Sequence, residues 1–369
     1  MSSQTTPNDN QALPMLIRAF AGEATPRTPI WYMRQAGRYL PEYNELRRGR
    51  SFLELSETVE LAVEVSLQPF RRFAVDGIIM FSDILTPLKG AGIPLHFEEK
   101  KGPVLDQTVA DESEMHHLRE DFDPGVDTAH VADILKTLRA HIDALPAGTE
   151  RPALLGFAGA PFTLASYLVE GGTSKKFEKT KGAVFGASEF FHSLSDRLTE
   201  HMIRYLKMQI DAGADAVQIF DSWAGILSPA DYAEFAAPYT QRIVAALQEY
   251  TPRPVILFVG NSAHLLKEMI AQQPRVLSLD WRVQAPAVER EMEAAGALNK
   301  MAVQGNMDPL TLYGTPERVR SAASRVLENF AGFAGRGGYV FNLGHGIHPS
   351  SPIPNVQTML DTVRSFPVK

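Results

Sequence analysis

Eight short apolar runs recur along this 369-residue chain, and they constrain its fold more than any other feature. They cover residues 29–32, 77–81, 153–157, 216–220, 255–259, 276–279, 301–304 and 339–341. Each is nearly continuous in apolar residues rather than alternating, as expected of strands buried on both faces. Segments with apolar residues at helical spacing separate the runs, among them 187–210, 231–249 and 315–330. Strand–helix alternation repeated eight times predicts an α/β fold, a single parallel (β/α)8 barrel of the TIM type.

An open, doubly wound sheet that uses six or seven of the runs is the alternative fold. Residues 87–150 exceed one strand–helix unit, and glycine and proline punctuate them, which predicts an excursion with a short hairpin after the second strand. Ser51 and Glu54 form a capping box that predicts a helix over residues 52–65. The polar residues 1–10 predict a disordered tail, residues 11–369 a single catalytic domain, and the Lys-rich residues 171–182 a mobile surface loop.

Composition excludes several classes of function. A net charge of −7 argues against a general nucleic-acid binder. The absence of cysteine excludes disulfides, thiolate nucleophiles, iron–sulfur clusters and thiolate zinc sites. The N-terminus does not resemble a secretory signal, and no apolar run reaches the length of a membrane span, so we expect a cytoplasmic protein that contacts neither membrane nor nucleic acid.

Metal and nucleotide motifs are weak or missing. His345 and His348 have the spacing of metal ligands, but Pro349 follows them and no third ligand is evident, so we expect no metal site. The glycine-rich residues 335–338 precede a predicted strand instead of opening a helix, unlike a phosphate loop.

The first loop at the expected functional end of the barrel carries a cluster of arginines. Catalytic groups in such barrels follow the carboxyl ends of the strands. After the first run the chain reads MRQAGRYLP, and residues 27–50 hold six Arg against two acids. Guanidinium groups suit carboxylates and phosphates, and Gly37 would let backbone N–H groups join them. We predict an anion site at Arg34 and Arg38, whereas Arg47, Arg48 and Arg50 are expected on a solvated face.

Four more polar residues follow other runs. Asp83 comes after the second run, where a partly buried carboxylate needs N–H donors that a ligand could supply; a loop or helix cap is the alternative. Tyr167, Ser222 and His345 follow the third, fourth and eighth runs. Their alternatives are a packing residue, a cap and a structural histidine. Ser222 lacks the G-x-S-x-G context of a nucleophile elbow.

Taken together, these fragments resemble the uroporphyrinogen decarboxylase family. The match spans residues 13–366 and rests on PIWYMRQAGRYLPEY, IIMFSDIL, GFAGAPFTLASYLVEGG, QIFDSWAG, QGNMDP and FNLGHGIHP, in that family's order. The resemblance implies a homodimeric, cofactor-free (β/α)8 barrel that converts the four acetates of uroporphyrinogen III to methyls in porphyrin biosynthesis. It also implies site residues: Arg34, Gln35, Ala36, Gly37 and Arg38 on substrate carboxylates, Asp83 on the pyrrole N–H groups, Tyr167, Ser222 and His345 completing the site, and Phe157 and Phe220 lining its floor.

The chemistry of such a substrate agrees with the residues. Eight carboxylates would explain a local Arg cluster in an acidic chain. A pyrrole protonated on a ring carbon is its own electron sink, so no pyridoxal, thiamine or metal is expected. Asp83, Arg34 and Arg38 are the expected catalytic residues: Asp83 would stabilise the cation, and Arg34 and Arg38 would hold carboxylates. Two alternatives stay open: a methyltransferase of the same superfamily, whose thiolate-zinc versions need Cys, and a tetrapyrrole carrier without turnover.

Overall fold

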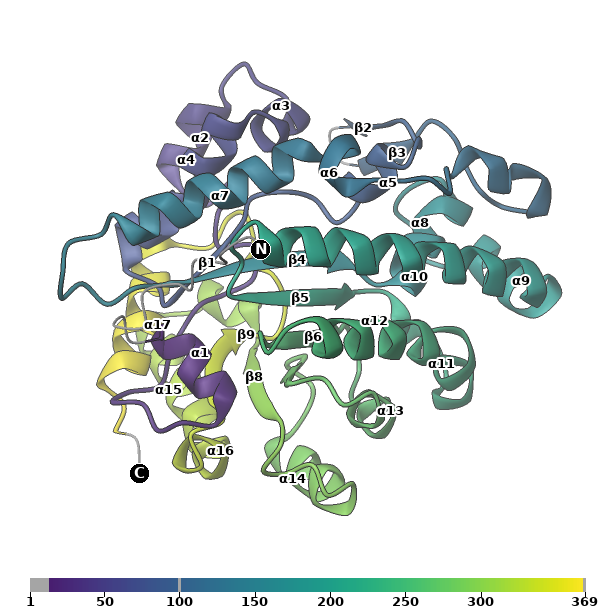
Figure 1. The fold of residues 1–369 in the computed structure, drawn as a ribbon. Coiled ribbons are helices and arrows are strands. Elements are labelled where there is room, and N and C mark those ends of the chain that lie inside the picture. Colours follow the sequence, from purple (N-terminus) through teal and green to yellow (C-terminus); the bar gives the residue numbers. More distant parts are fainter. Residues whose placement is uncertain (1–12, 99–100, 368–369) are drawn as a thin grey trace, which may run out of the picture.

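A curled parallel sheet wrapped by helices forms the body of the computed structural model, which describes residues 13–98 and 101–367 (Figure 1). All its neighbouring strands run parallel, in the order β1-β4-β5-β6-β7-β8-β9. The bounds are β1 Gly77–Ile79, β4 Ala153–Gly159, β5 Ala216–Asp221, β6 Val255–Val259, β7 Val276–Ser278, β8 Ala302–Met307 and β9 Tyr339–Leu343. Seven of the eight predicted runs therefore contain strands, and the predicted TIM-type barrel is confirmed.

The remaining run, residues 29–32, fills the gap between the first and last strands. Ile30 forms a parallel bridge with Phe341 of β9, and the N–H of Phe341 donates to Pro29 O at 2.9 Å. On the other side, Asp76 N donates to Ile30 O at 2.9 Å, one residue before β1. The segment stays a single bridge because the N–H of Ile30 donates to the Asp76 carboxylate at 2.7 Å, not to a neighbouring strand.

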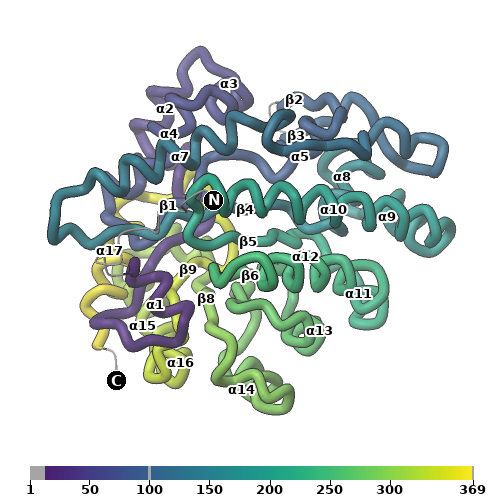
Figure 2. The backbone as a smooth tube through the Cα atoms, in the orientation of Figure 1, coloured from purple at the N-terminus to yellow at the C-terminus, as the bar shows by residue number. Residues whose placement is uncertain are grey.

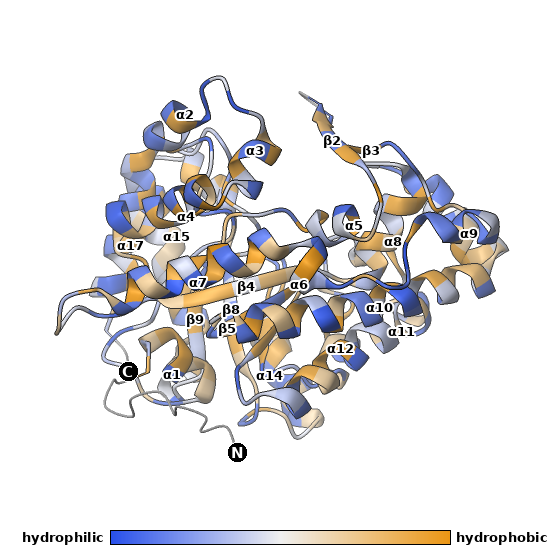
Figure 3. Ribbon diagram, turned by 45° about the horizontal axis from the view of Figure 1, so that its top comes forward, coloured by the Kyte–Doolittle hydropathy of each residue, from blue (hydrophilic) through white to orange (hydrophobic). Residues whose placement is uncertain are grey.

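Helices cover the outside of the sheet, with apolar residues along the strands and hydrophilic residues toward the exterior (Figure 3). Their bounds are α1 Met15–Ala21, α2 Pro41–Arg47, α3 Phe52–Glu57, α4 Val59–Phe73, α5 Thr86–Gly90, α6 Pro124–Asp127, α7 Ala129–Asp143, α8 Pro161–Glu170, α9 Glu178–Gly186, α10 Ser188–Asp211, α11 Pro229–Phe235, α12 Ala237–Tyr250, α13 Leu266–Ala271, α14 Ala285–Ala294, α15 Pro316–Asn329, α16 Ala331–Gly335 and α17 Ile353–Ser365. Short 3-10 helices occupy η1 Glu112–His117, η2 Ala224–Ile226 and η3 Pro309–Tyr313.

Most of the predicted helices are present. Ser51 Oγ accepts from the N–H of Glu54 at 3.1 Å, which confirms the predicted cap of α3. The single helix predicted over residues 52–65 is instead divided into α3 and α4 at Thr58, whose backbone is extended. The helices expected over 187–210 and 315–330 are α10 and α15. The single helix expected over 231–249 is instead broken into α11 and α12 at Ala236. Pro238 explains the break, because it has no N–H to donate back to α11 and favours the first turn of a new helix.

The predicted excursion after the second run contains the expected hairpin. Strands β2 (Leu95–Glu98) and β3 (Gly102–Leu105) pair antiparallel. The loop expected over 171–182 is wrong in its second half, where residues 178–182 begin α9. Thr180 is fully buried there, and its N–H and hydroxyl both donate to Glu170 Oε1 at 2.9 Å. The tail expected over residues 1–10 lies outside the described residues.

One end of the barrel is closed by α1. This helix packs against β4, β8 and β9, and it brings the start of the described chain beside the C-terminal elements (Figure 2). Leu16 on α1 reaches β1 so closely that a Cβ at Gly77 would lie 3.0 Å from it. The carboxyl ends of the strands, where the polar loops begin, are at the opposite end.

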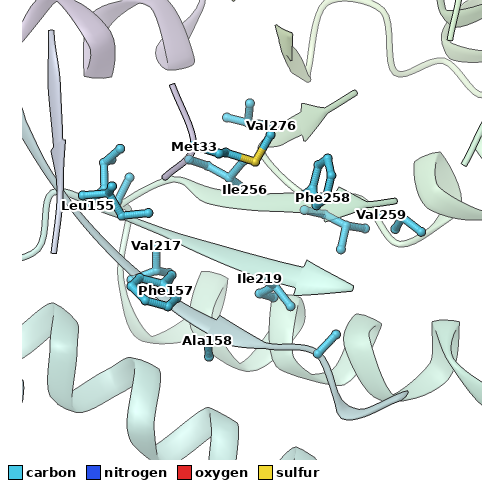
Figure 4. Close-up of a cluster of buried hydrophobic side chains, with 14 of the residues drawn as sticks. Met33, Leu155, Phe157, Ala158, Val217, Ile219, Ile256, Phe258, Val259 and Val276 are labelled. Atoms are coloured by element: carbon cyan, nitrogen blue, oxygen red, sulfur yellow. The ribbon is translucent and has the colours of Figure 1, made fainter. Parts of the chain in front are cut away.

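The interior of the barrel combines an apolar core with a hydrogen-bonded layer. Figure 4 shows Met33 among buried side chains from β4, β5, β6 and β7. In the layer, Trp31 Nε1 donates to Gln304 Oε1 at 2.7 Å, and Gln304 Nε2 donates to Gln218 Oε1 at 3.1 Å and to Ser278 Oγ at 3.0 Å. Since these groups are fully buried and mutually bonded, they tie β5, β7 and β8 to the segment that leads into Arg34.

Candidate active site

The loop that carries the two predicted anion-binding arginines is anchored to the end of β9. The N–H of Met33 donates to Asn342 Oδ1 at 3.2 Å, and Ile347 N donates to Met33 O at 2.9 Å. Arg34 then takes a left-handed conformation, with φ of 59°. Its side chain passes over Gly346, where a Cβ would lie 2.7 Å from Arg34 Cγ. Gly346 is therefore needed for Arg34 to lie across this turn.

Both arginines are exposed and unpaired. Within the described part of the chain, neither the Arg34 nor the Arg38 guanidinium makes a hydrogen bond or ion pair with another group. The backbone N–H groups of residues 35–38 also have no acceptor among the described residues. Gly37 does not have a positive φ, so the turn that we expected from Gly37 is made by Arg34 instead. The loop thus presents two cations and a run of free N–H groups.

The other two predicted members of this loop differ in burial. The Gln35 side chain is fully buried, and its Nε2 donates to Gly77 O at 3.0 Å. Tyr39 donates its hydroxyl to Gln35 O at 2.7 Å, which anchors the loop from the other side. Ala36 is only partly buried and packs against the core. Gln35 can therefore offer a ligand its backbone N–H but not its side chain.

Asp83 leaves the end of β1 as a partly buried carboxylate with spare acceptor capacity. Its Oδ1 accepts the N–H of Leu85 at 2.9 Å, so the cap that we considered as the alternative is present. Its Oδ2 has no partner among the described residues. Burial raises the pKa of Asp83, while the Leu85 N–H and the nearby charge of Arg34 oppose that rise. One oxygen of the carboxylate thus remains free for an N–H donor.

Tyr167 approaches Asp83 from α8. Burial raises the pKa of Tyr167, the charge of Asp83 raises it further, and Arg34 lowers it. The Tyr167 ring stacks on Trp223, with ring centroids 3.8 Å apart and an interplanar angle of 27°. The structure therefore brings Arg34 and Asp83, from two loops, together with Tyr167 from helix α8.

The residues predicted to form the apolar floor belong to a row of aromatic rings in contact. Phe157 on β4 contacts Phe220 on β5 at 5.7 Å between centroids, and Phe220 contacts Phe258 on β6 at 5.9 Å. Phe258 in turn contacts His345 at 6.3 Å. Burial, with the charge of Arg34 as a second cause, lowers the pKa of His345 to about 4. His345 is therefore neutral at neutral pH.

Ser222 follows β5 and is not a helix cap. Its hydroxyl has no hydrogen bond among the described residues, and the N–H of Trp223 donates instead to Thr163 Oγ1 at 3.2 Å. Burial raises the pKa of Tyr43, and the charges of Arg47 and Arg38 oppose that rise, whereas Arg34 and not Arg38 acts on the pKa of Asp83. Arg38 therefore shares the loop of Arg34 without sharing its neighbours.

Two groups of residues at this end of the barrel were missed by the sequence analysis. Trp223 supports Tyr167, and residues 280–282 follow β7 beside His345. The signal for Asp280 was present, because it comes directly after the apolar run 276–279 as Asp83 comes after 77–81.

Within residues 13–98 and 101–367, no group of three or more His, Asp or Glu side chains is placed to hold a metal ion. None of the described helices is both long and apolar enough to cross a bilayer.

Comparison with known proteins gives a consistent result. Residues 12–366 match the family described as uroporphyrinogen decarboxylase (URO-D). The chain is 43% identical over 350 residues to the uroporphyrinogen decarboxylase of Synechococcus sp., covering 95% of this chain and 96% of that one. It is 43% identical over 355 residues to the uroporphyrinogen decarboxylase of Gloeobacter violaceus, covering 95% and 97%. Among solved structures, a methyltransferase from Methanosarcina mazei shares the fold, with a TM-score of 0.75 at 19% identity, covering 95% of this chain and 97% of that one.

Proposed function

Because this chain belongs to the uroporphyrinogen decarboxylase family, we propose that it is a carboxy-lyase that converts uroporphyrinogen III to coproporphyrinogen III. The observation that carries the proposal is that a free hydrogen-bond acceptor and a free cation lie close together at one end of the barrel. Asp83 has a free carboxylate oxygen, and Arg34, whose charge acts on Asp83, makes no hydrogen bond or ion pair with any described residue. A ligand with both N–H donors and carboxylates satisfies both groups at once.

The proposed reaction uses the pyrrole as its electron sink. A proton adds to a ring carbon and makes the pyrrole cationic. The C–C bond to the acetate carboxyl then breaks, carbon dioxide leaves, and the electron pair moves into the ring. A proton on the exocyclic carbon completes the methyl, and the ring proton is lost. The negative charge of Asp83 lowers the energy of the cationic intermediate. Because the carboxylate is already in place before the reaction starts, no reorganisation is needed.

The other residues orient the substrate. Arg34 and Arg38 bind carboxylates, with the backbone N–H groups of Gln35, Ala36 and Gly37 beside them. Phe157 and Phe220 form an apolar surface for the macrocycle. Tyr167, Ser222 and His345 supply neutral polar contacts around it, since His345 is uncharged at neutral pH. Catalysis is assigned to Asp83, with Arg34 and Arg38 holding the reacting substrate in place.

The proposal also covers assembly and location. We assign residues 11–369 to one catalytic domain that works as a cytoplasmic homodimer without a metal or organic cofactor, as the family resemblance implies. A substrate that supplies its own electron sink supports the last point. Protein stripped with chelator and gel-filtered should keep full activity. Loss of activity that one added metal or coenzyme restores would contradict this part.

The decisive experiment is direct. Pure protein is incubated with uroporphyrinogen III, and the products are resolved by their number of carboxylates. We expect successive loss of four carboxylates, ending at coproporphyrinogen III. Binding of the macrocycle without release of carbon dioxide would instead support the tetrapyrrole carrier.

A further inference from the structure

The segment that follows β7 packs against the turn that carries His345. Parallel strands of one sheet end at the same edge, so residues 280–283 emerge at the same end of the barrel as the loops after β1, β5 and β9. Trp281 meets the His345 ring edge to face, with centroids 6.3 Å apart and an interplanar angle of 87°. Gly344 permits this approach, because a Cβ there would lie 2.8 Å from Trp281 Cα. One flank of the 344–346 turn therefore meets Trp281, and the other carries Arg34.

Arg282, the next residue, is held rigidly. Its Nη1 donates to both oxygens of Asp280, at 3.1 and 2.9 Å, and its guanidinium lies 3.9 Å above the Trp281 ring. Asp280 is only 1% exposed, and it also accepts from the backbone N–H of Asn261 at 3.2 Å and of Arg282 at 2.9 Å. A cation that is stacked and paired in this way loses little conformational freedom when a ligand binds.

One edge of this guanidinium is unused. The Arg282 side chain is 47% exposed. Its Nε and Nη2 have no acceptor within the part of the chain that the structure describes. These two nitrogens form the planar fork that binds a carboxylate through two parallel hydrogen bonds. Asp280 takes up only Nη1, so its pairing with Arg282 leaves that fork open.

We propose that Arg282 is a further substrate-binding residue, which binds a peripheral carboxylate of the tetrapyrrole on the side of His345 away from Arg34. This inference rests on the proposed function, because it needs a ligand with several carboxylates spread around a ring. Uroporphyrinogen carries eight, more than Arg34 and Arg38 can engage. The contacts Arg34–Gly346, His345–Trp281 and Trp281–Arg282 form a continuous arc along which such carboxylates can be distributed.

The test compares Arg282→Gln with Arg282→Lys. The Gln variant loses the charge and the fork, whereas the Lys variant keeps a charge for Asp280 but loses the fork. Arg290→Gln on α14 is the matched control, since Arg290 is exposed and, among the described residues, pairs only with its neighbour Glu291. KM and kcat are measured with uroporphyrinogen III, and the dissociation constant with coproporphyrinogen III. Thermal unfolding of each variant reports whether it folds.

We expect Arg282→Gln to raise KM by roughly five- to tenfold with kcat changed less than about twofold, as for loss of a half-exposed charged contact. Arg282→Lys should raise KM by roughly threefold or more, and Arg290→Gln should change neither constant. A folded Arg282→Gln variant with wild-type KM overturns the proposal. If that variant does not fold, wild-type KM in Arg282→Lys overturns it. Should the wild-type protein release no carbon dioxide, an effect of Arg282 on coproporphyrinogen binding still supports the subsite while the proposed activity fails.

Discussion

Arg27 and Arg34 lie seven residues apart in the same cluster, yet their surroundings differ completely. Arg27 donates to both oxygens of Asp76, at 2.7 and 2.8 Å, and to Glu150 at 2.9 Å. Arg34 makes no hydrogen bond or salt bridge with any described residue. Residues 29–32 separate them and run along the barrel wall, so the two arginines leave the wall at opposite ends. An arginine count therefore locates a charged segment, whereas the protein partners of each arginine decide which of these cations can bind a ligand.

The largest effect should come from the unpaired arginines. We expect Arg34→Ala/Arg38→Ala to lower kcat/KM by at least about 10³, because losing each charged carboxylate contact costs about 2–5 kcal/mol. The free energy of unfolding should change by less than about 0.5 kcal/mol, since neither guanidinium makes a hydrogen bond or ion pair with the described residues. Steady-state kinetics and urea unfolding measure the two quantities. Arg47→Ala/Arg48→Ala, in the same segment, is the control; a folded double variant of Arg34 and Arg38 with intact turnover would refute the anion site.

Asp83 should give the next largest effect. Asp83→Asn keeps the shape and one acceptor oxygen but removes the charge that opposes the pyrrole cation. We expect kcat to fall by about 10²–10³, as for loss of a preorganised electrostatic partner, while coproporphyrinogen binding weakens but stays measurable. Single-turnover kinetics and fluorescence titration separate these effects. Asp361→Asn, at an exposed position on α17, should leave both unchanged. Equal losses in binding and kcat/KM with unchanged kcat would mean that Asp83 only holds the ligand.

Substitution of Arg27 should show the reverse pattern, a loss of stability with little loss of activity. Arg27→Ala leaves Asp76, whose side chain is 4% exposed, without its counter-ion. We expect a loss of about 3 kcal/mol in the free energy of unfolding, because breaking a buried pair strands a charge. The kcat/KM of the folded fraction should stay within about twofold of wild type. Removing both charges in Arg27→Met/Asp76→Asn should recover part of the stability, and a large loss of kcat/KM in Arg27→Ala would erase the contrast with Arg34.

Asp221 shows that the partners of a charged group also decide the behaviour of an anion. It is fully buried at the end of β5. Its Oδ1 accepts from the Thr163 hydroxyl at 2.7 Å, and its Oδ2 has no partner in the described part of the chain. Burial raises the pKa of Asp221 to about 7 from an ordinary 3.8. The folded state thus holds a proton that the unfolded state releases between pH 4 and 7, so this group makes stability fall as pH rises through that window.

Asp221→Asn removes that penalty. We take the unfolding free energy of the variant minus that of wild type. This difference should become more positive by about 1–3 kcal/mol between pH 4.5 and pH 8, with the change complete above pH 7. Urea unfolding at four pH values measures the difference. Asp211→Asn, an exposed carboxylate on α10, is the control and should give a nearly flat difference. A flat difference for Asp221→Asn as well would mean that Asp221 titrates normally.

The repeating architecture was predictable from the sequence because burial on both faces leaves continuous apolar runs. What the runs could not predict is where hydrogen bonds from distant residues replace a strand partner. Residues 29–32 look like a strand, but Asp76 takes the N–H of Ile30 and reduces the segment to one bridge. The break between α11 and α12 follows from Pro238, a signal that periodicity alone does not register.

The candidate site was partly predictable for a similar reason. Residue type and position after a strand singled out Arg34, Asp83 and His345, which the structure brings together. Neither type nor position could show that the Gln35 side chain is buried under the loop or that Arg34, and not Gly37, makes the turn. Those facts depend on contacts with Gly77 and Gly346, which are distant in sequence.

The smallest expected effect is a change in the pKa of His345, and it tests the contrast between Arg27 and Arg34 most locally. The pKa of His345 is lowered to about 4 by burial first and by the positive charge of Arg34 second. Arg34→Gln removes that charge and keeps much of the volume, so the imidazolium becomes easier to form and the pKa of His345 should rise, though not to its ordinary value, because burial remains. The ring protons of His345, assigned with His345→Gln, report the titration by NMR. Arg27→Gln should leave the pKa unmoved, since Arg27 is at the other end of the wall. A His345 pKa that is the same in the Arg34 variant and in wild type would place the Arg34 guanidinium away from the 344–346 turn in solution, and the anion site would lose its link to His345.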